Sequence, residues 1–127
     1  MNDRQVVVAA SLNLFVAVAA GAFGAHALKA QLSPEMLAIW QTAASYQTTH
    51  GLGMIGIAVL MGRFGTILLS HAASVMLLGI ILFSGSLYLL ALTGLREFGV
   101  ITPFGGAAFL IAWFLVMRAA WKGSTFR

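Results

Sequence analysis

The stretch QTAASYQTTH, residues 41–50, followed by the apolar run GLGMIGIAVLMG, residues 51–62, decides how this chain can fold. The twelve residues of the apolar run reach only about 18 Å as a helix, whereas the hydrocarbon core of a bilayer is about 30 Å thick. A membrane-spanning helix must therefore include the polar residues before the run, which places residues 47–50 near the middle of the membrane. Amide and ionisable groups at that depth normally face a bundle interior or a cavity, so they are candidates for function.

The composition is that of an integral membrane protein. Of its 127 residues, 61% are hydrophobic and only 8% are charged, whereas soluble domains carry about 25% charged residues. This length holds one domain, residues 1–127, with about four helices of roughly 20 residues each. It leaves no room for a soluble catalytic domain. The absence of cysteine excludes disulfides, iron–sulfur clusters, thiolate zinc sites and cysteine nucleophiles.

Hydropathy predicts four spans, at about residues 6–27, 43–62, 68–93 and 102–121. The first run has some features of a signal peptide, but its start carries a single Arg offset by Asp3, so we expect a transmembrane helix. Thr102-Pro103 is expected to cap the fourth helix.

The beginning of the second helix is indicated by Ser33-Pro34-Glu35, which supplies a cap, a proline at the first helical position and an acid in the first turn. Two shapes are possible. One long helix can run from Pro34 to Gly62, or an interfacial amphipathic segment can bend near Ser45 into a short span. The predicted fold class is therefore all-α, an integral membrane four-helix bundle whose second helix is long or preceded by an interfacial segment.

Polar residues recur at helical spacing along this second helix. The polar residues on one side are Gln41, Ser45, Thr48 and Thr49. The opposite side of the helix carries Met36, Trp40, Ala44 and Gln47. Thr42, Tyr46 and His50 follow one another at intervals of four residues and share a further face.

The orientation follows from the basic residues near the ends of the spans. The N-terminus, the turn after the second span and the C-terminus share one side, which carries five basic residues: Arg4, Arg63, Arg118, Lys122 and Arg127. The other side carries only Lys29 and Arg96, each with an acid nearby. We therefore expect a multi-pass inner-membrane protein with both termini in the cytoplasm. Because the basic residues are scattered singly, we expect no nucleic-acid partner.

Small residues predict close helix packing. Gly51-Leu-Gly-Met-Ile-Gly56 matches G-x-G-x-x-G, but it continues a membrane helix, whereas a dinucleotide fingerprint follows a strand. Small residues let helix backbones approach where lipid supplies no hydrophobic drive. The residues expected at helix contacts are Gly21, Gly24, Gly51, Gly53 and Gly85, the first two against the second helix.

Three histidines raise the question of a metal or haem. His26 ends the first span on the outer side and His71 lies near the cytoplasmic side, so the three cannot meet at one centre. His26 and His50 pair only if the second helix bends. We expect no metal and no cofactor. His50 is expected to be neutral and hydrogen-bonded, with Tyr46 or a serine of the third span as its partner.

No Asp or Glu lies inside a predicted span, which disfavours a cation-coupled transporter and most general acid–base chemistry, so we expect no enzyme. The remaining polar and aromatic groups near the middle of the membrane form the candidate intramembrane site, in which Gln47 or His50 is expected to bond a serine of the third span. Its members are His26, Trp40, Gln41, Tyr46, Gln47, His50, Ser84 and Ser86.

Four segments carry a resemblance to a known family over nearly the whole chain: residues 21–28 (GAFGAHAL), 40–47 (WQTAASYQ) with His50, 82–94 (LFSGSLYLLALTG) and 99–106 (GVITPFGG). They resemble the small, four-span bacterial inner-membrane family typified by YgdD and YwdK. The resemblance implies a four-helix membrane fold and no established activity.

Three functional hypotheses follow. The first is a non-enzymatic membrane module that binds a lipid or small apolar ligand, or assembles with a second copy or another membrane protein. The second is a channel or carrier for a small solute, lined by the Tyr46/Gln47/His50 face. The third is a haem or metal protein.

Overall fold

The computed structural model describes residues 1–65 and 67–123, and within them it contains helices and turns but no strand. The prediction of an all-α four-helix bundle is confirmed. Its elements in chain order are α1 (Asp3–Val18), a π-helical turn (Ala19–Gly24), α2 (Ala25–Leu28), α3 (Pro34–Phe64), α4 (Ile67–Thr93), a 3-10 turn (Arg96–Val100) and α5 (Thr102–Lys122). The first helix of the bundle is α1 and α2 joined by the π-helical turn.

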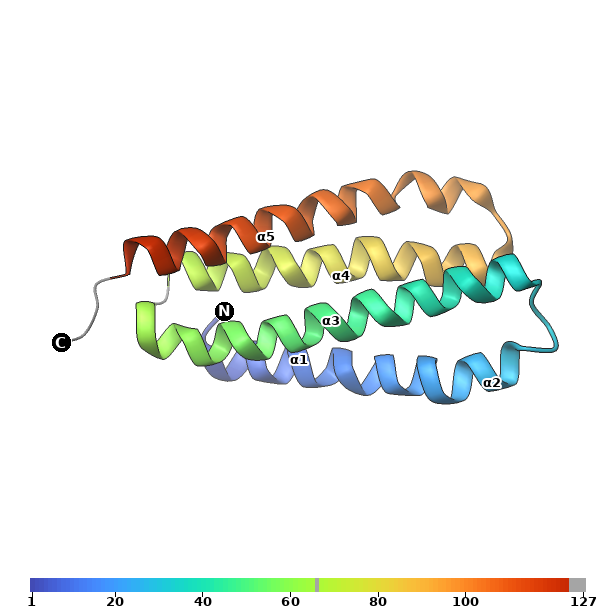
Figure 1. Ribbon diagram of the computed structural model, residues 1–127, viewed down its shortest axis with the longest axis horizontal. Helices are drawn as coiled ribbons and strands as arrows, with labels where there is room; N and C mark the ends of the chain where they lie inside the picture. Colours follow the sequence, from blue (N-terminus) through green and yellow to red (C-terminus); the bar gives the residue numbers. More distant parts are fainter. Residues whose placement is uncertain (66, 124–127) are drawn as a thin grey trace.

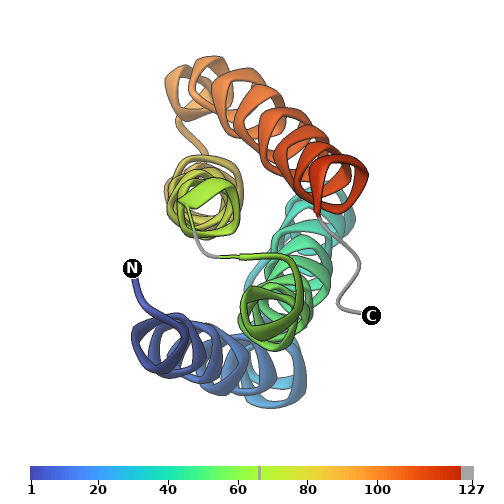
Figure 2. The same ribbon diagram turned by 90° about the vertical axis from the view of Figure 1, so that its left-hand side faces the viewer.

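The helices run antiparallel to their neighbours in sequence, so the start of α1 and the ends of α3 and α5 lie at one end of the bundle (Figure 1). Seen end-on, α1 and α5 occupy opposite sides, with α3 and α4 between them (Figure 2). Helix α3 packs on α1 and α4, and α4 packs on α3 and α5. Helices α3 and α4 therefore form the centre of the bundle and join α1 to α5.

Helix α3 is continuous, which decides between the two predicted shapes. The Ser33 hydroxyl accepts a hydrogen bond from the Met36 N–H at 3.2 Å, and Pro34 occupies the first turn, as predicted. The helix runs 31 residues without a bend at Ser45 and ends at Gly65, whose φ of 90° favours glycine.

The inward side of α3 forms much of the bundle core. Its buried residues follow alternating spacings of four and three: Ala43, Gln47, His50, Met54, Ile57 and Met61. Met54 and Ile57 pack with Val6 of α1 and with Leu69 and Met76 of α4. Because lipid tails are as apolar as these side chains, the gain from burial is close packing rather than removal from water.

Close packing involves three of the five glycines expected at helix contacts. A Cβ atom on Gly24 would lie 2.7 Å from the Trp40 ring, one on Gly51 would lie 2.9 Å from Leu14, and one on Gly53 would lie 3.0 Å from Trp113. The expectation was wrong for Gly21 and Gly85, since a Cβ on either would meet nothing within 4 Å.

The position of the buried stripe explains the error at Gly21. The stripe on the first helix runs through buried Ala10, Ala17 and Ala20 and partly buried Asn13 and Gly24, with spacings of three and four. Gly21 falls beside this stripe and is exposed. On α4, the glycine that contacts α5 is Gly79, where an added Cβ would lie 2.6 Å from the Phe109 ring. Gly85 is therefore not needed for that contact.

Within the described residues, three helical segments are long and apolar enough to cross a membrane: Asp3–Leu28, Ile67–Thr93 and Arg96–Lys122. Helix α3 is not among them, although it lies at the centre of the bundle. Its sequence is too polar by this measure because it contains the polar stretch of residues 41–50.

Candidate functional site

The level of α3 within the bundle is set by its contacts with α4. The Ser84 hydroxyl donates to the Ala43 carbonyl at 2.8 Å, and an added Cβ on Gly53 would lie 3.1 Å from the Met76 sulfur. Residues 43–53 of α3 therefore lie beside residues 76–84 of α4, around the midpoint of that helix. Gln47 and His50 are thus at the middle of the apolar length of α4.

Gln47 joins three helices through its side-chain amide. Its Nε2 donates to Asn13 Oδ1 of α1 at 3.1 Å, and the Tyr88 hydroxyl of α4 donates to its Oε1 at 2.8 Å. The residue is only 5% exposed. The expected bond from Gln47 to a serine of the third span was wrong, because Tyr88, one helical turn beyond Ser84, takes that position.

Trp40 extends this cluster toward α2. Its indole N–H donates to the Ala20 carbonyl at 2.9 Å, and its ring meets the Tyr88 ring edge-on with centroids 4.6 Å apart. Ala20 lies in the π-helical turn, and its carbonyl also accepts the Ala25 N–H. The missing side chain of Gly24 leaves room for the indole. Trp40 therefore ties α3 to both the first helix and α4.

His50 belongs to a second, aromatic cluster on the α5 side of α3. Its Nδ1 donates to the Tyr46 carbonyl at 2.8 Å, and because a carbonyl only accepts, Nδ1 carries the proton. The imidazole stacks on Phe109 with centroids 3.6 Å apart. The partner is thus Tyr46, as expected, but through its backbone; the expected serine partner was wrong, since Ser84 and Ser86 bond elsewhere.

The two predicted serines, Ser84 and Ser86, bind backbone carbonyls, and Ser86 also pairs with a hydroxyl of α5. Ser86 Oγ donates to the Phe83 carbonyl at 2.9 Å and lies 2.6 Å from Thr102 Oγ1. The expectation that Thr102 caps its own helix was wrong, since its hydroxyl pairs with Ser86 and α5 has no side-chain cap. These bonds occupy the hydroxyls of Ser84, Ser86 and Thr102 and tie α4 to α3 and α5.

The eight predicted site residues do not form one site. Trp40 and Gln47 lie in the first cluster, and Tyr46 and His50 lie in the aromatic cluster. Ser84 bonds the Ala43 backbone of α3, and Ser86 bonds Thr102 of α5. His26 and Gln41 are exposed. Tyr88 was missed, although its spacing of four residues from Ser84 would have indicated a shared face.

The histidines also lie apart. His26 is exposed at the end of the first helix, His50 packs on α5, and His71 lies near the start of α4. Because α3 does not bend, the condition for pairing His26 with His50 is not met. No three His, Asp or Glu side chains of the described residues are grouped so that they could hold a metal ion.

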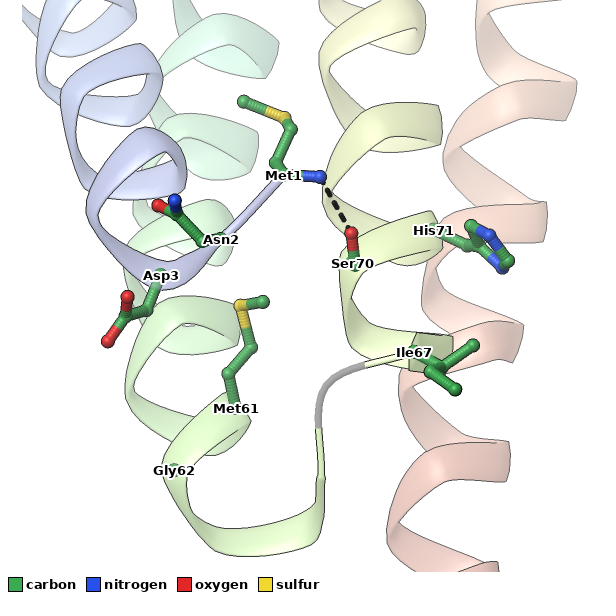
Figure 3. A pocket seen from close by; sticks show the side chains of 8 residues that line it. All are labelled: Met1, Asn2, Asp3, Met61, Gly62, Ile67, Ser70 and His71. Atoms are coloured by element: carbon green, nitrogen blue, oxygen red, sulfur yellow. Dashed lines mark hydrogen bonds between the residues drawn. The ribbon is translucent and has the colours of Figure 1, made fainter.

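A cavity of about 470 Å³ opens at the end of the bundle where α1 begins (Figure 3). The Met1 ammonium donates to the Ser70 hydroxyl at 2.7 Å there, and one Asp3 oxygen accepts the Arg4 backbone N–H. The cavity is more than three helical turns from Gln47 along α3, since its α3 residues are Met61 and Gly62. It is therefore separate from both clusters.

A further feature is the outward face of α3, which we define as seven exposed residues: Ala38, Thr42, Ser45, Thr49, Leu52, Gly56 and Val59. Gln41 and Thr48 are exposed beside it. The hydroxyls of Thr42 and Thr48 donate to carbonyls of their own helix. Among the described residues, the hydroxyls of Ser45 and Thr49 have no such bond. The sequence predicted that Ser45 and Thr49 lie on the opposite side of the helix from Ala44 and Gln47. This prediction is confirmed, because Ser45 and Thr49 are exposed whereas Ala44 and Gln47 are buried.

Comparison with known proteins identifies close relatives. The family described as "Protein of unknown function (DUF423)" matches residues 20–106. A UPF0382 membrane protein of Staphylococcus epidermidis is 43% identical over 119 residues, which cover 94% of this chain and 97% of the relative.

Two further relatives are similar over the same length. The UPF0382 membrane protein YwdK of Bacillus subtilis is 39% identical over 120 residues, covering 94% of this chain and 98% of YwdK. The UPF0382 inner membrane protein YgdD of Escherichia coli is 40% identical over 120 residues, covering 94% of this chain and 92% of YgdD. No solved structure shows a significant match.

Proposed function

Because this chain belongs to the DUF423 family of membrane proteins, whose description assigns no function, we propose from its geometry that it is a non-enzymatic assembly module. The outward face of α3 would bind a transmembrane helix of a protein partner. One observation carries this proposal: Ser45 and Thr49 are exposed at the level of Gln47, in the middle of the bundle.

The physical reason is the poor solvation of polar groups by lipid. Water in the bilayer core is too scarce to bond a hydroxyl or amide, and each unsatisfied group is costly. Single exposed serines occur elsewhere, such as Ser11 and Ser74. On α3, by contrast, polar side chains cluster within three turns at residues 41, 42, 45, 48 and 49. Contact with another protein would shield this cluster and supply hydrogen-bond partners.

The inner clusters support assembly over conduction. Gln47 uses both ends of its amide on Asn13 and Tyr88, and the His50 ring lies against Phe109. A channel through one chain along the Tyr46/Gln47/His50 face would have to break these contacts. We therefore favour a structural role for both clusters.

The absence of a suitable acid supports a non-enzymatic role. The chain has three acidic residues, and no Asp or Glu occurs between Glu35 and Glu97. The polar residues at the middle of the bundle thus include no carboxylate for general acid–base catalysis.

We further propose that both termini are cytoplasmic, because five basic residues accompany that side of the bundle against two on the other. A reporter that is active only in the periplasm, fused after Arg127, should be silent. Activity of that fusion would contradict the orientation.

The double substitution of Ser45 and Thr49 by leucine is expected to weaken association of the chain with its partner. Interhelical hydrogen bonds average about 0.6 kcal/mol, and bulkier side chains add about 1–3 kcal/mol of misfit. Association should therefore weaken by about tenfold or more. The measurement is the protein mass of the particle in mild detergent, by light scattering on a sizing column.

The matched control replaces Ser11 and Ser74 with leucine, two exposed serines of α1 and α4. This control should retain the wild-type particle mass. A wild-type particle with the mass of one chain, or a Ser45/Thr49 variant that associates like wild type, would contradict the assembly role.

A further inference from the structure

We propose that the partner at the outward face of α3 is a second copy of this chain, bound through the same face in a parallel pair. This inference rests on the proposed assembly function and names its partner. The pair would be related by a two-fold axis along the membrane normal, the closed symmetry of most homodimers.

The first support is the spacing of the exposed residues. Ala38, Thr42, Ser45, Thr49, Leu52, Gly56 and Val59 follow one another at intervals of four, three, four, three, four and three. This is the 3.5-residue period at which two helices pack side by side over many turns. The inward stripe from Ala43 to Met61 has the same period. Helix α3 thus has two packing seams, and only the inward one is filled by its own chain.

The second support is the small size of the outward residues. Alanine, serine, threonine and glycine occupy five of the seven positions, and such residues line the contacts of membrane helices because they let backbones approach. An added Cβ on Gly56 would meet nothing within 4 Å, unlike one on Gly51 or Gly53. The space beside Gly56 is therefore open to a neighbouring helix.

The third support is the self-complementary chemistry of the face. A two-fold axis along the membrane normal brings each residue near its counterpart at the same depth. Serine and threonine hydroxyls and the Gln41 amide both donate and accept, so each can pair with a copy of itself. Residues 36–62 contain no Asp, Glu, Lys or Arg, so no like charges meet.

A second copy also satisfies the requirement for matching depth. Copies inserted in the same direction automatically place Ser45 and Thr49 at the same level, whereas a different protein would need its own polar groups there. In Figure 2, α4 lies on one side of α3, and no helix of the described chain covers the opposite side. A partner helix can reach α3 there without moving the bundle.

The test uses single cysteines, because the chain has none of its own. Cysteine replaces Ser45, Thr49, Leu52 or Gly56, one at a time, in the full-length protein. The controls are Phe15→Cys and Leu110→Cys, both at residues that are 75% exposed. Phe15 is two residues from Asn13, which bonds Gln47, and Leu110 follows Phe109, which stacks on His50. The controls therefore lie at the same depth.

Native membranes are oxidised with copper phenanthroline, and the products are identified by mass spectrometry. We expect a disulfide-linked product of two identical chains at all four α3 positions, several-fold more abundant than at either control. Each variant must keep the wild-type unfolding temperature.

Three results would overturn the proposal in distinguishable ways. Equal yields at all positions would indicate random collisions of the chain and refute the specific pair. A product joining Thr49 to a different, reproducible protein would refute the second copy while keeping the assembly role. Absence of any product at the four α3 positions would refute both the second copy and the assembly role.

Discussion

Leucine at Gly105 is expected to prevent normal packing of α5 on α4. A Cβ on Gly105 would overlap the backbone nitrogen of Phe83 and lie 2.7 Å from its Cα. Because the obstacle is backbone, no rotamer change can relieve it, and the helices must separate. We expect a loss at the upper end of overpacking effects, about 3 kcal/mol or more. Thermal unfolding in a fixed detergent measures it.

Gly106 offers the matched control for this substitution. A Cβ there would only approach the Phe83 ring at 4.0 Å, an ordinary contact. Gly106→Leu should therefore unfold near the wild-type temperature. Equal destabilisation by the two substitutions would show that α4 and α5 do not approach most closely at Gly105.

Gln47→Leu should destabilise the bundle by about 1–3 kcal/mol, because it leaves two partly buried partners without a bond. Asn13 Oδ1 loses its donor from Gln47 and the Tyr88 hydroxyl loses its acceptor. The measurement is again the unfolding temperature in detergent.

A double-mutant cycle with Tyr88→Phe tests this cause directly. Tyr88→Phe removes the hydroxyl that Gln47→Leu strands, so the double variant should lose less stability than the sum of the single variants. Strict additivity would mean that Gln47 and Tyr88 do not depend on each other.

Features within one helix could be predicted from the sequence. Ser33 and Pro34 fix the start of α3 because their chemistry acts on the first helical turn. The shortness of the apolar run 51–62 correctly placed Gln47 and His50 at the middle of the bundle. The division of α3 into a buried side with Gln47 and an exposed side with Ser45 followed from the helical period.

Contacts between helices were harder to predict. Tyr88 and Gln47 are 41 residues apart in sequence, and their meeting depends on how α4 is rotated about its axis. Helix α4 is apolar on all sides, so its sequence indicates no preferred face. Without a preferred face, the sequence could not show which α4 side chain meets Gln47. A serine was expected there, whereas Ser84 bonds the Ala43 carbonyl.

The shielding of α3 from lipid is the most direct test of the proposed interface. A nitroxide attached to a single cysteine at Thr49 reports how often oxygen dissolved in the bilayer collides with that position, and Phe15 and Leu110 provide exposed references. We predict low oxygen accessibility at Thr49 and high accessibility at both references in native-like membranes. Accessibility at Thr49 equal to that at Phe15 and Leu110 would show that the outward face of α3 meets lipid, and would contradict its role as an interface.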